Sequence, residues 1–375
     1  MASNFIRRFT KWFFVSLNIL GCIVFLLSCL SPYVSPAQWG PIGFLALIFP
    51  YLAVLLIFSV IFWLVAKPVV ALMPLVTLLI GWQQLSVVFA WHPMHTFNAE
   101  NKGDSSLRIV DWNVRGMYGL SNSSYKQHRN RDDIAAAINK LKPDIICLQE
   151  FNNSTYEKDL STNNIKQFTD YCPYYFFSKD YHNKNGHYQA GCIIFSKYPI
   201  ADSGRFIYPG ANGESVIYAD IVKGNDTVRI FTTHLQSFQF TENDYANLEK
   251  IKDPDEEILE ASKNIYSKMK LIFLRQAAQA GIVKKAVDKS PYPSLLCGDF
   301  NNVPNSYTYF HLRDKRQDAF LATSFGVGRS FNAMAPTLRI DYILPDSSFK
   351  IQQFDMADEG LSDHHMLVAD ISLKK

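Results

Sequence analysis

The sequence predicts a mixed α/β or α+β sandwich that is preceded by three membrane-spanning helices. Three observations support this prediction: long uncharged apolar runs near the N-terminus, a change of composition near residue 100, and an alternation of strand and helix patterns after it. We therefore expect two parts, an anchor over residues 1–99 and a globular domain over residues 100–375.

Charge separates the two parts. Residues 1–99 carry only four charged side chains, Arg7, Arg8, Lys11 and Lys67, and Glu100 is the first acid. The whole chain has 37 basic and 34 acidic residues, so the part after residue 99 holds 33 bases against 34 acids. A near-neutral domain offers no large basic field for a polyanion, which weakens a nucleic-acid-binding interpretation without excluding it.

Three apolar stretches, at about residues 12–30, 42–66 and 69–91, are long enough to span a membrane. A span needs about 20 apolar residues to cross the hydrocarbon core. Buried core helices are the alternative, but runs this long and this free of charge are rare in soluble cores. A cleaved signal peptide would account for the first stretch alone.

Basic residues in the short flanks predict the orientation of these helices. Arg7, Arg8 and Lys11 keep the N-terminus in the cytoplasm, and Lys67 lies on the same side after two crossings. The third helix then delivers Glu100 and everything after it to the far side. We expect an integral membrane protein whose globular domain is extracytoplasmic, periplasmic or extracellular.

Beyond residue 100 the pattern alternates between strands and helices. Apolar runs predict strands at 108–114, 144–149, 191–196, 215–221, 227–235, 294–297, 338–344 and 366–371. Helical spacing of apolar residues predicts helices at 132–141 and within 242–288. The lysines of the second helical stretch indicate a solvated face, with contact to anionic lipid heads as the alternative.

The six cysteines include no CxxC pair and no zinc-ligand spacing. Cys147, Cys192 and Cys297 lie inside apolar runs that read as strands. We therefore predict that these three thiols are buried and unreactive. Nothing in the sequence demands a disulfide framework.

Polar side chains stand at or just beyond the ends of the apolar strands. One such residue alone is usually a cap or a turn former. Together they are acids, amides and imidazoles, the types that form a hard-metal hydrolytic centre in which Mg²⁺ keeps some waters and gains phosphate oxygens. They are Asn113, Glu150, His234, Asp299, Asn301, Asp341, Asp363 and His364.

Six short segments resemble, in order, the successive motifs of the endonuclease/exonuclease/phosphatase superfamily. They are residues 111–116 (DWNVRG), 147–150 (CLQE), 233–237 (THLQS), 298–304 (GDFNNVP), 339–344 (RIDYIL) and 362–365 (SDHH). The resemblance covers about residues 105–375. It implies a four-layer α/β/β/α sandwich of two mixed sheets with the active site at one edge.

The resemblance also implies roles at the metal. Glu150 would be the main ligand of Mg²⁺, for which Mn²⁺ is a substitute, with Asn113 beside it and Asp363 in the water shell. Asp299 and Asn301 would position and activate the attacking water.

The two histidines have implied roles as well, each with an alternative. Asp341 would hold His364 protonated, so that it stabilises the transition-state charge, and the alternative makes His364 the general base. His234 would give a proton to the leaving oxygen, and the alternative is a structural histidine.

Three departures from the motifs of two subgroups narrow the branch of the superfamily that the chain resembles. Arg115 stands where exonuclease III-type apurinic endonucleases carry an acid, and His234 where they carry a tyrosine. Residues 339–342 differ from the signature of inositol polyphosphate phosphatases. The chain is more similar to the secreted deoxyribonuclease and neutral sphingomyelinase branches. Arg115 is a candidate phosphate clamp, and an equally good interpretation is a surface salt bridge.

The predicted function is that of a membrane-tethered, Mg²⁺-dependent phosphodiester or phosphoester hydrolase. The expected partners are the lipid bilayer and a phosphodiester-containing substrate, either a lipid head group or a nucleic acid. A nuclease acting on extracellular DNA or RNA is the first alternative. A catalytically silent binding module on the same fold is the second, and the retention of the candidate catalytic residues speaks against it.

Overall fold

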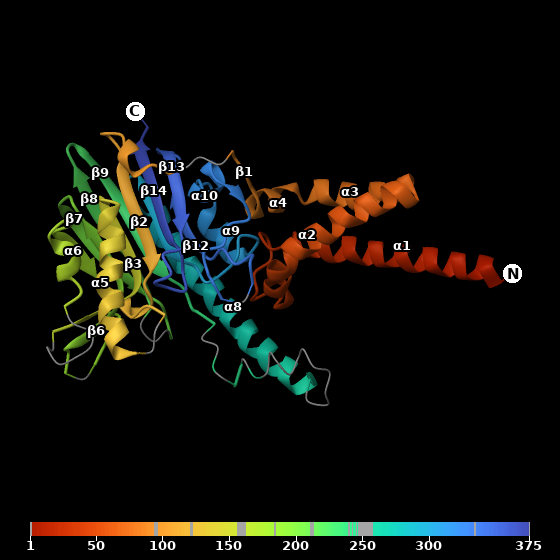
Figure 1. Ribbon diagram of the computed structural model, residues 1–375, viewed down its shortest axis with the longest axis horizontal. Helices are drawn as coiled ribbons and strands as arrows, with labels where there is room; N and C mark the ends of the chain where they lie inside the picture. Colours follow the sequence, from red (N-terminus) through yellow and green to blue (C-terminus); the bar gives the residue numbers. More distant parts are fainter. Residues whose placement is uncertain are drawn as a thin grey trace.

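The computed structural model describes residues 2–93, 97–120, 123–155, 163–183, 185–210, 214–238, 241, 243–244, 246, 258–333 and 335–374. Figure 1 shows two parts, an arm of helices that ends at the N-terminus and a larger domain of sheets and helices.

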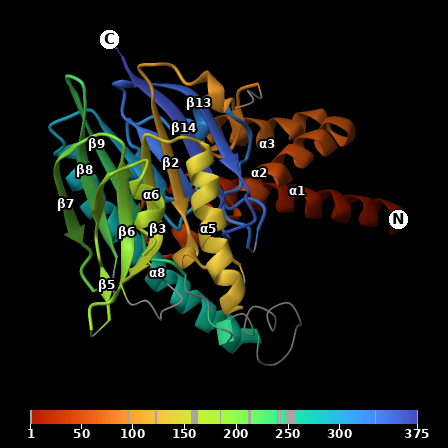
Figure 2. The same cartoon turned by 60° about the vertical axis from the view of Figure 1, so that its left-hand side comes forward.

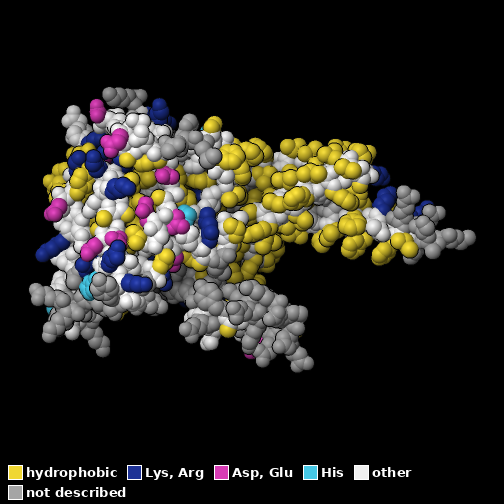
Figure 3. Space-filling model, viewed as in Figure 1, with side chains coloured by type: hydrophobic (Ala, Val, Ile, Leu, Met, Phe, Trp, Pro, Cys, Tyr) yellow, Lys and Arg dark blue, Asp and Glu magenta, His cyan; other side chains and the backbone are white. Residues whose placement is uncertain are grey.

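The arm consists of α1 (Ala2–Ser28), α2 (Pro41–Ala66), α3 (Pro68–Ile80) and α4 (Trp82–Val88). Two of these helices, α1 and α2, are long and apolar enough to cross a membrane, and the number rises to three if α3 and α4 count as one bent span. The first two predicted spans therefore have matching helices. Figure 3 shows hydrophobic side chains over most of the visible arm.

The third predicted span, over about 69–91, corresponds to a bent pair of helices, which counts as a span only if both helices are taken together. α3 and α4 meet at 66°, and Gly81 between them has φ −83° and ψ 15°, outside the helical region. A Cβ at Gly81 would lie 2.4 Å from the Phe25 ring, so glycine permits the close approach of α1 at the bend. Residues 90–91 form a short strand, β1 (Ala90–Trp91), which pairs with β11 (Phe325–Gly326).

The larger of the two main sheets has the strand order β13-β14-β2-β3-β6-β4, and β5 also pairs with β6. Its helices are α5 (Ser124–Lys140) and the short α6 (Lys166–Thr169). The strands are β2 (Leu107–Asn113), β3 (Ile145–Ser154), β4 (Tyr174–Phe177), β5 (Tyr181–His182), β6 (Tyr188–Ser196), β13 (Phe349–Ala357) and β14 (Met366–Leu373).

The second sheet has the order β12-β10-β9-β8-β7. Its strands are β7 (Ile200–Ile207), β8 (Ser215–Lys223), β9 (Asp226–His234), β10 (Ser294–Asp299) and β12 (Asp341–Pro345). The long helix α8 (Ile258–Asp288) precedes β10, and α9 (Tyr307–Arg313) and α10 (Ala319–Thr323) follow it. The predicted helical stretch 242–288 is confirmed from residue 258 onward, and most of its first part lies outside the described residues.

Alternating side chains of the strands fill three layers of core. On β2, Ile109 faces the second sheet, whereas Val110 and Trp112 pack under α5, as the two-residue period of a strand requires. On the other side, α8 covers the second sheet, with Val283 against the cluster that contains Leu296. The predicted four-layer α/β/β/α sandwich is confirmed, and Figure 2 shows α5 in front of β2 and β3.

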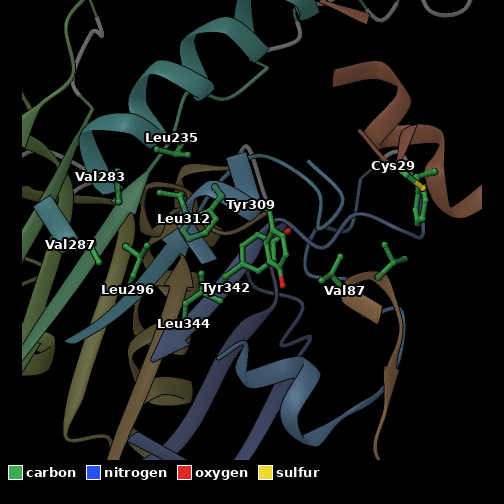
Figure 4. Packing of buried hydrophobic residues seen from close by; sticks show 14 of the residues in the cluster. Cys29, Val87, Leu235, Val283, Val287, Leu296, Tyr309, Leu312, Tyr342 and Leu344 are labelled. Atoms are coloured by element: carbon green, nitrogen blue, oxygen red, sulfur yellow. The ribbon is translucent and has the colours of Figure 1, made fainter. Parts of the chain in front are cut away.

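The arm and the domain share one apolar cluster. It runs from Val283 and Leu296 through Tyr309 and Tyr342 to Val87 and Cys29 of the arm (Figure 4). Because these side chains are removed from water together, the arm is packed on the domain and is not a freely hinged tether.

Polar contacts cross the same boundary. The Arg339 guanidinium donates through Nη2 to the Val87 carbonyl at 2.9 Å and pairs through Nη1 with Asp318 at 2.7 Å. Asn305 Nδ2 donates to the Ser28 carbonyl at 3.2 Å. A buried guanidinium that is held by these partners fixes the orientation of α4 on the domain.

Candidate active site

The strand registers bring distant motifs side by side. β2 and β3 run parallel with Asn113 opposite Gln149, next to Glu150. β9 and β10 also run parallel, with His234 opposite Asp299. Parallel strands end at the same edge of a sheet, so side chains at their carboxyl ends meet there.

Glu150 is turned toward this edge by a break in the strand pairing. The register of β3 and β6 shifts between Leu148 and Phe151, and Glu150 within the shift has φ 51°. Positive φ is uncommon for a residue with a side chain, and bulges of this kind re-aim side chains next to active sites. The Glu150 side chain is 42% exposed, whereas Asp299 beside it is only 1% exposed.

Asn113 joins the two carboxylates. Its Nδ2 donates to Glu150 Oε1 and to Asp299 Oδ2, each at 3.1 Å. Its Oδ1 accepts from the Arg115 backbone N at 3.1 Å. One amide therefore holds two carboxylates, contributed by different sheets, at a fixed separation.

Asp299 lies in a buried, negatively charged environment. Burial, followed by repulsion from Asp341, raises the pKa of Asp299 to about 6. The backbone N of Asn301 donates to Asp299 Oδ1 at 2.8 Å. Gly298 before it has φ 128°, and a Cβ there would lie 2.1 Å from the Thr233 carbonyl, so only glycine allows β10 to approach β9 this closely.

His364 is paired with Asp341. Both Asp341 carboxylate oxygens lie 3.0 Å from His364 Nδ1, and His364 Nε2 lies 3.7 Å from Asp299 Oδ2. Burial opposes protonation, but the Asp341 and Asp299 carboxylates outweigh it and raise the pKa of His364 to about 10. The ring is packed on Phe331, with centroids 4.8 Å apart.

His234 faces the same carboxylates. Its Nε2 lies 3.7 Å from Glu150 Oε1 and 3.6 Å from Asp299 Oδ2, and it is a buried atom without a hydrogen-bond partner in the described part of the chain. Burial lowers the pKa of His234, but Asp299 and Glu150 reverse the direction and raise it. A buried imidazole nitrogen with no partner is costly unless a ligand group comes to it.

Asn301, Arg115 and Asp363 lie around this centre. Asn301 has φ 49°, and its Nδ2 donates to the Leu235 carbonyl at 2.9 Å. Arg115 Nε lies 3.8 Å from Asp363 Oδ2, and both side chains are partly exposed, at 43% and 32%. Asp363 lines the same cavity as Glu150, whereas Arg115 is not among the described residues that line it.

Several supporting residues have no counterpart in the sequence predictions. Gln276 of α8 donates to the carbonyls of Gln236 and Asn301, at 2.7 and 2.9 Å. Gln149 donates to the buried Asp111 at 2.7 Å and to Thr232 of the other sheet at 2.8 Å. Amides at buried positions of an amphipathic helix or a strand are the sequence signal for such links, because a buried amide needs partners.

The donor set fits a divalent cation that prefers oxygen. Ligand atoms of Asp299, Asp341 and His364 lie within 4.8 Å of one another. Because His364 is paired with Asp341, the oxygens of Glu150 and Asn113, which adjoin Asp299, are the ones best placed to hold a cation. Carboxylate and amide oxygens are typical ligands of Mg²⁺. All six cysteines are buried and unpaired, which confirms the predicted burial of Cys147, Cys192 and Cys297.

Two features indicate the class to which this protein belongs. They are the four-layer sandwich and the carboxylates and histidines gathered at one edge of its sheets. The family model of the endonuclease/exonuclease/phosphatase family matches residues 112–364. The chain belongs to this family, whose members are generally hydrolases of phosphate esters. A second model, described as a domain of unknown function, matches residues 10–88.

Solved structures resemble this one in fold. An endonuclease/exonuclease/phosphatase from Bacteroides vulgatus is 18% identical, covers 72% of this chain and 100% of its own, and has a TM-score of 0.50. Truncated Caenorhabditis elegans TDP2 is 17% identical, with 71% and 98% covered and a TM-score of 0.48. No curated protein matches the sequence.

Proposed function

We propose that this chain is a membrane-tethered, Mg²⁺-dependent phosphodiester or phosphoester hydrolase. Residues 1–99 would form the anchor and residues 100–375 the catalytic domain. The observation that carries the proposal is that both site histidines lie 3.6 to 3.7 Å from the Asp299 carboxylate, and His234 lies 3.7 Å from Glu150, at the edge of the sheets. Side chains from distant segments of the chain thus surround one small volume.

In this proposal Glu150 and Asn113 hold the cation, and Asp363 binds its water shell. A bound Mg²⁺ would neutralise charge on the phosphate and on the departing oxygen. Asn113 joins the carboxylates of Glu150 and Asp299. Glu150 is the better suited to hold the cation because its carboxylate is the more exposed of the two. Mn²⁺ would substitute, since it takes the same oxygen ligands.

Asp299 and Asn301 orient the attacking water in line with the leaving group. The pKa of Asp299 is raised to about 6, which is closer to neutral pH. Asp299 is therefore a better proton acceptor than an ordinary carboxylate. His364, held protonated by Asp341, stabilises the charge that develops on the phosphate oxygens. His234 delivers a proton to the leaving oxygen, and the raised pKa of its buried ring supports this role.

The catalytic domain would lie outside the cytoplasm. Lys11 and Lys67 line one hollow between α1 and α2, at the end of the arm away from the domain, where Figure 3 shows basic side chains. Basic residues concentrate on the cytoplasmic side of membrane helices. The domain at the other end of the arm would then be periplasmic or extracellular.

The test uses the full chain, because the arm shares a core with the domain. The purified protein in detergent should hydrolyse bis(p-nitrophenyl) phosphate with Mg²⁺ or Mn²⁺ and not with EDTA. Glu150→Ala and Asp299→Ala should each lower kcat by at least about 10²-fold. Asp226→Ala, at the exposed opposite end of β9, is the control and should retain activity. Full activity of either site variant would refute its assignment.

A further inference from the structure

One cavity connects the catalytic residues with the membrane helices. It has a volume of about 450 Å³, and Glu150, Asp299 and His364 lie at its polar end. Leu47, Ile48 and Tyr51 of α2 lie in its wall. Its size falls within the range of pockets that enclose a small ligand, about 300–1,000 Å³.

Away from the catalytic residues the wall is mainly apolar. Side chains from α8, from the segment after β9 and from the segments between β10 and β12 add to those of α2. The additional apolar side chains are Phe238, Met269, Val303, Phe331, Ala335, Leu338 and Ile340. The cavity is therefore amphiphilic: its lining combines carboxylates, an imidazole and a few neutral polar side chains, among them Asn302 and Thr337, with a larger number of apolar side chains.

The apolar wall belongs to a helix that is apolar enough to cross a membrane. α2 meets that criterion over its whole length, Pro41–Ala66. Ile48 is 42% exposed and Tyr51 50%, and the exposed apolar surface continues along the helix with Val54 at 51%. The helix that contributes to the cavity wall thus also carries exposed apolar side chains that would face lipid.

Two contacts fix α2 beside the active site. Phe44 stacks on Tyr266 of α8, with ring centroids 5.0 Å apart. Further along, the Tyr51 hydroxyl lies 3.3 Å from Thr337 Oγ1, in the segment before β12. The helix is therefore held against the cavity from two sides, and its side chains are a fixed part of the wall.

We propose that this cavity binds the apolar chain of a lipid-borne phosphate ester, with the chain along Leu47, Ile48 and Tyr51. The proposal rests on the proposed function and names the substrate class of the same site. The phosphate lies at the carboxylate end, water attacks phosphorus, and the bond to the leaving oxygen breaks as that oxygen takes up a proton. The substrate enters sideways from the leaflet nearest the catalytic domain.

A nucleic acid fits this cavity less well. No lysine or arginine is among the described residues that line it, and nucleic-acid sites depend on such side chains to neutralise phosphates. Hydrocarbon walls bind a hydrocarbon chain with a gain of about fourfold in affinity for each methylene buried. The apolar wall therefore favours a substrate with a hydrocarbon chain over a substrate with a second phosphate.

The experiment compares alkyl p-nitrophenyl phosphodiesters from methyl to dodecyl, hydrolysed by the full chain in detergent at fixed concentration. The reacting group is the same throughout, so only the chain differs. We expect kcat/KM to rise by at least about tenfold between butyl and octyl. Ile48→Trp, which fills the cavity, and Ile48→Ser, which makes the wall polar, should each lower the octyl-to-methyl ratio at least about fivefold.

The matched control is Ile57→Trp. Ile57 is the same residue type, is 48% exposed, and stands nine residues further along α2, on the opposite face at about 100° per residue. It should keep the wild-type ratio.

The outcomes separate the two proposals. Hydrolysis of the methyl ester with no dependence on chain length would overturn the lipid-chain site and leave the hydrolase assignment standing. An equal fall in the octyl-to-methyl ratio for Ile57→Trp would also overturn the lipid-chain site, since the dependence on chain length would then arise in the detergent micelle and not in the cavity. No hydrolysis of any ester would refute the hydrolase assignment itself.

Discussion

Replacing Asp341 by asparagine tests how His364 works. Asp341 places both carboxylate oxygens 3.0 Å from His364 Nδ1, and both residues are almost fully buried, at 2% and 5% exposure. The pair raises the pKa of His364 to about 10, so the ring is protonated at pH 7.5. The Asp341→Asn substitution keeps the shape of the side chain and removes its charge.

The expected loss follows from these values. Asp341→Asn removes the largest of the effects that raise the pKa of His364, and Asp299 is left as the main carboxylate opposing burial, so a smaller fraction of the imidazole is protonated at pH 7.5. Loss of the fixed tautomer and ring orientation adds to this effect, as it does in other aspartate–histidine pairs. We therefore expect Asp341→Asn to lower kcat by about 10²–10⁴-fold.

The assay is kcat for bis(p-nitrophenyl) phosphate from pH 5 to 10.5 at saturating Mg²⁺. Wild-type activity should persist well above neutral pH, whereas residual activity of Asp341→Asn should increase toward acidic pH. A wild-type kcat that instead rises steadily through the alkaline range would make His364 the general base. Asp358→Asn removes the carboxylate 3.7 Å from the neighbouring His365 and is the matched control, with kcat expected to change less than about threefold. An Asp341→Asn enzyme as active as this control would refute the reasoning.

Three further predictions concern stability and topology. In the EDTA-treated protein, the pKa of His364, raised to about 10, contributes to the free energy of unfolding. This contribution is complete below about pH 6.5 and is lost as the pH rises toward 10. Chemical denaturation should show the loss in the wild type and not in His364→Ala. Asp318→Asn leaves the Arg339 guanidinium buried without its 2.7 Å partner and should reduce the free energy of unfolding by about 3–5 kcal/mol, whereas a reduction below about 1 kcal/mol would mean that water reaches the site. Because all six native cysteines are buried, a membrane-impermeant maleimide should label Asp226→Cys in intact cells and Lys67→Cys only after permeabilisation, and the reverse pattern would invert the proposed orientation.

The sequence was sufficient to predict the strands that position the site. Residues such as Ile109, Ile146 and Leu296 form unbroken apolar runs because both faces of their strands are buried. The polar residues at their ends stand out against these runs, and their order along the chain matches that of one family. That is why distant residues such as Asn113 and Asp299 were correctly expected near one another.

The same sequence patterns could not predict the edge strands or the tertiary contacts. β7 is largely exposed, and Asp202, Ser203 and Arg205 interrupt its apolar residues. β13 has a register shift between Ile351 and Gln353 that breaks its alternation. Neither strand therefore produces an apolar strand signal. Ile48 and Tyr51 look like any lipid-facing residues in the sequence. Only the packing of α2 on the domain places them in the wall of the catalytic cavity.

The proposed metal site can be tested by anomalous diffraction from crystals of the full chain grown with Mn²⁺ and phosphate. We expect an Mn²⁺ peak at about 2.0–2.3 Å from a Glu150 carboxylate oxygen, with phosphate bound between it and His364. Crystals that bind Mn²⁺ elsewhere and leave phosphate away from Glu150, Asp299 and His364 would contradict the proposed metal site.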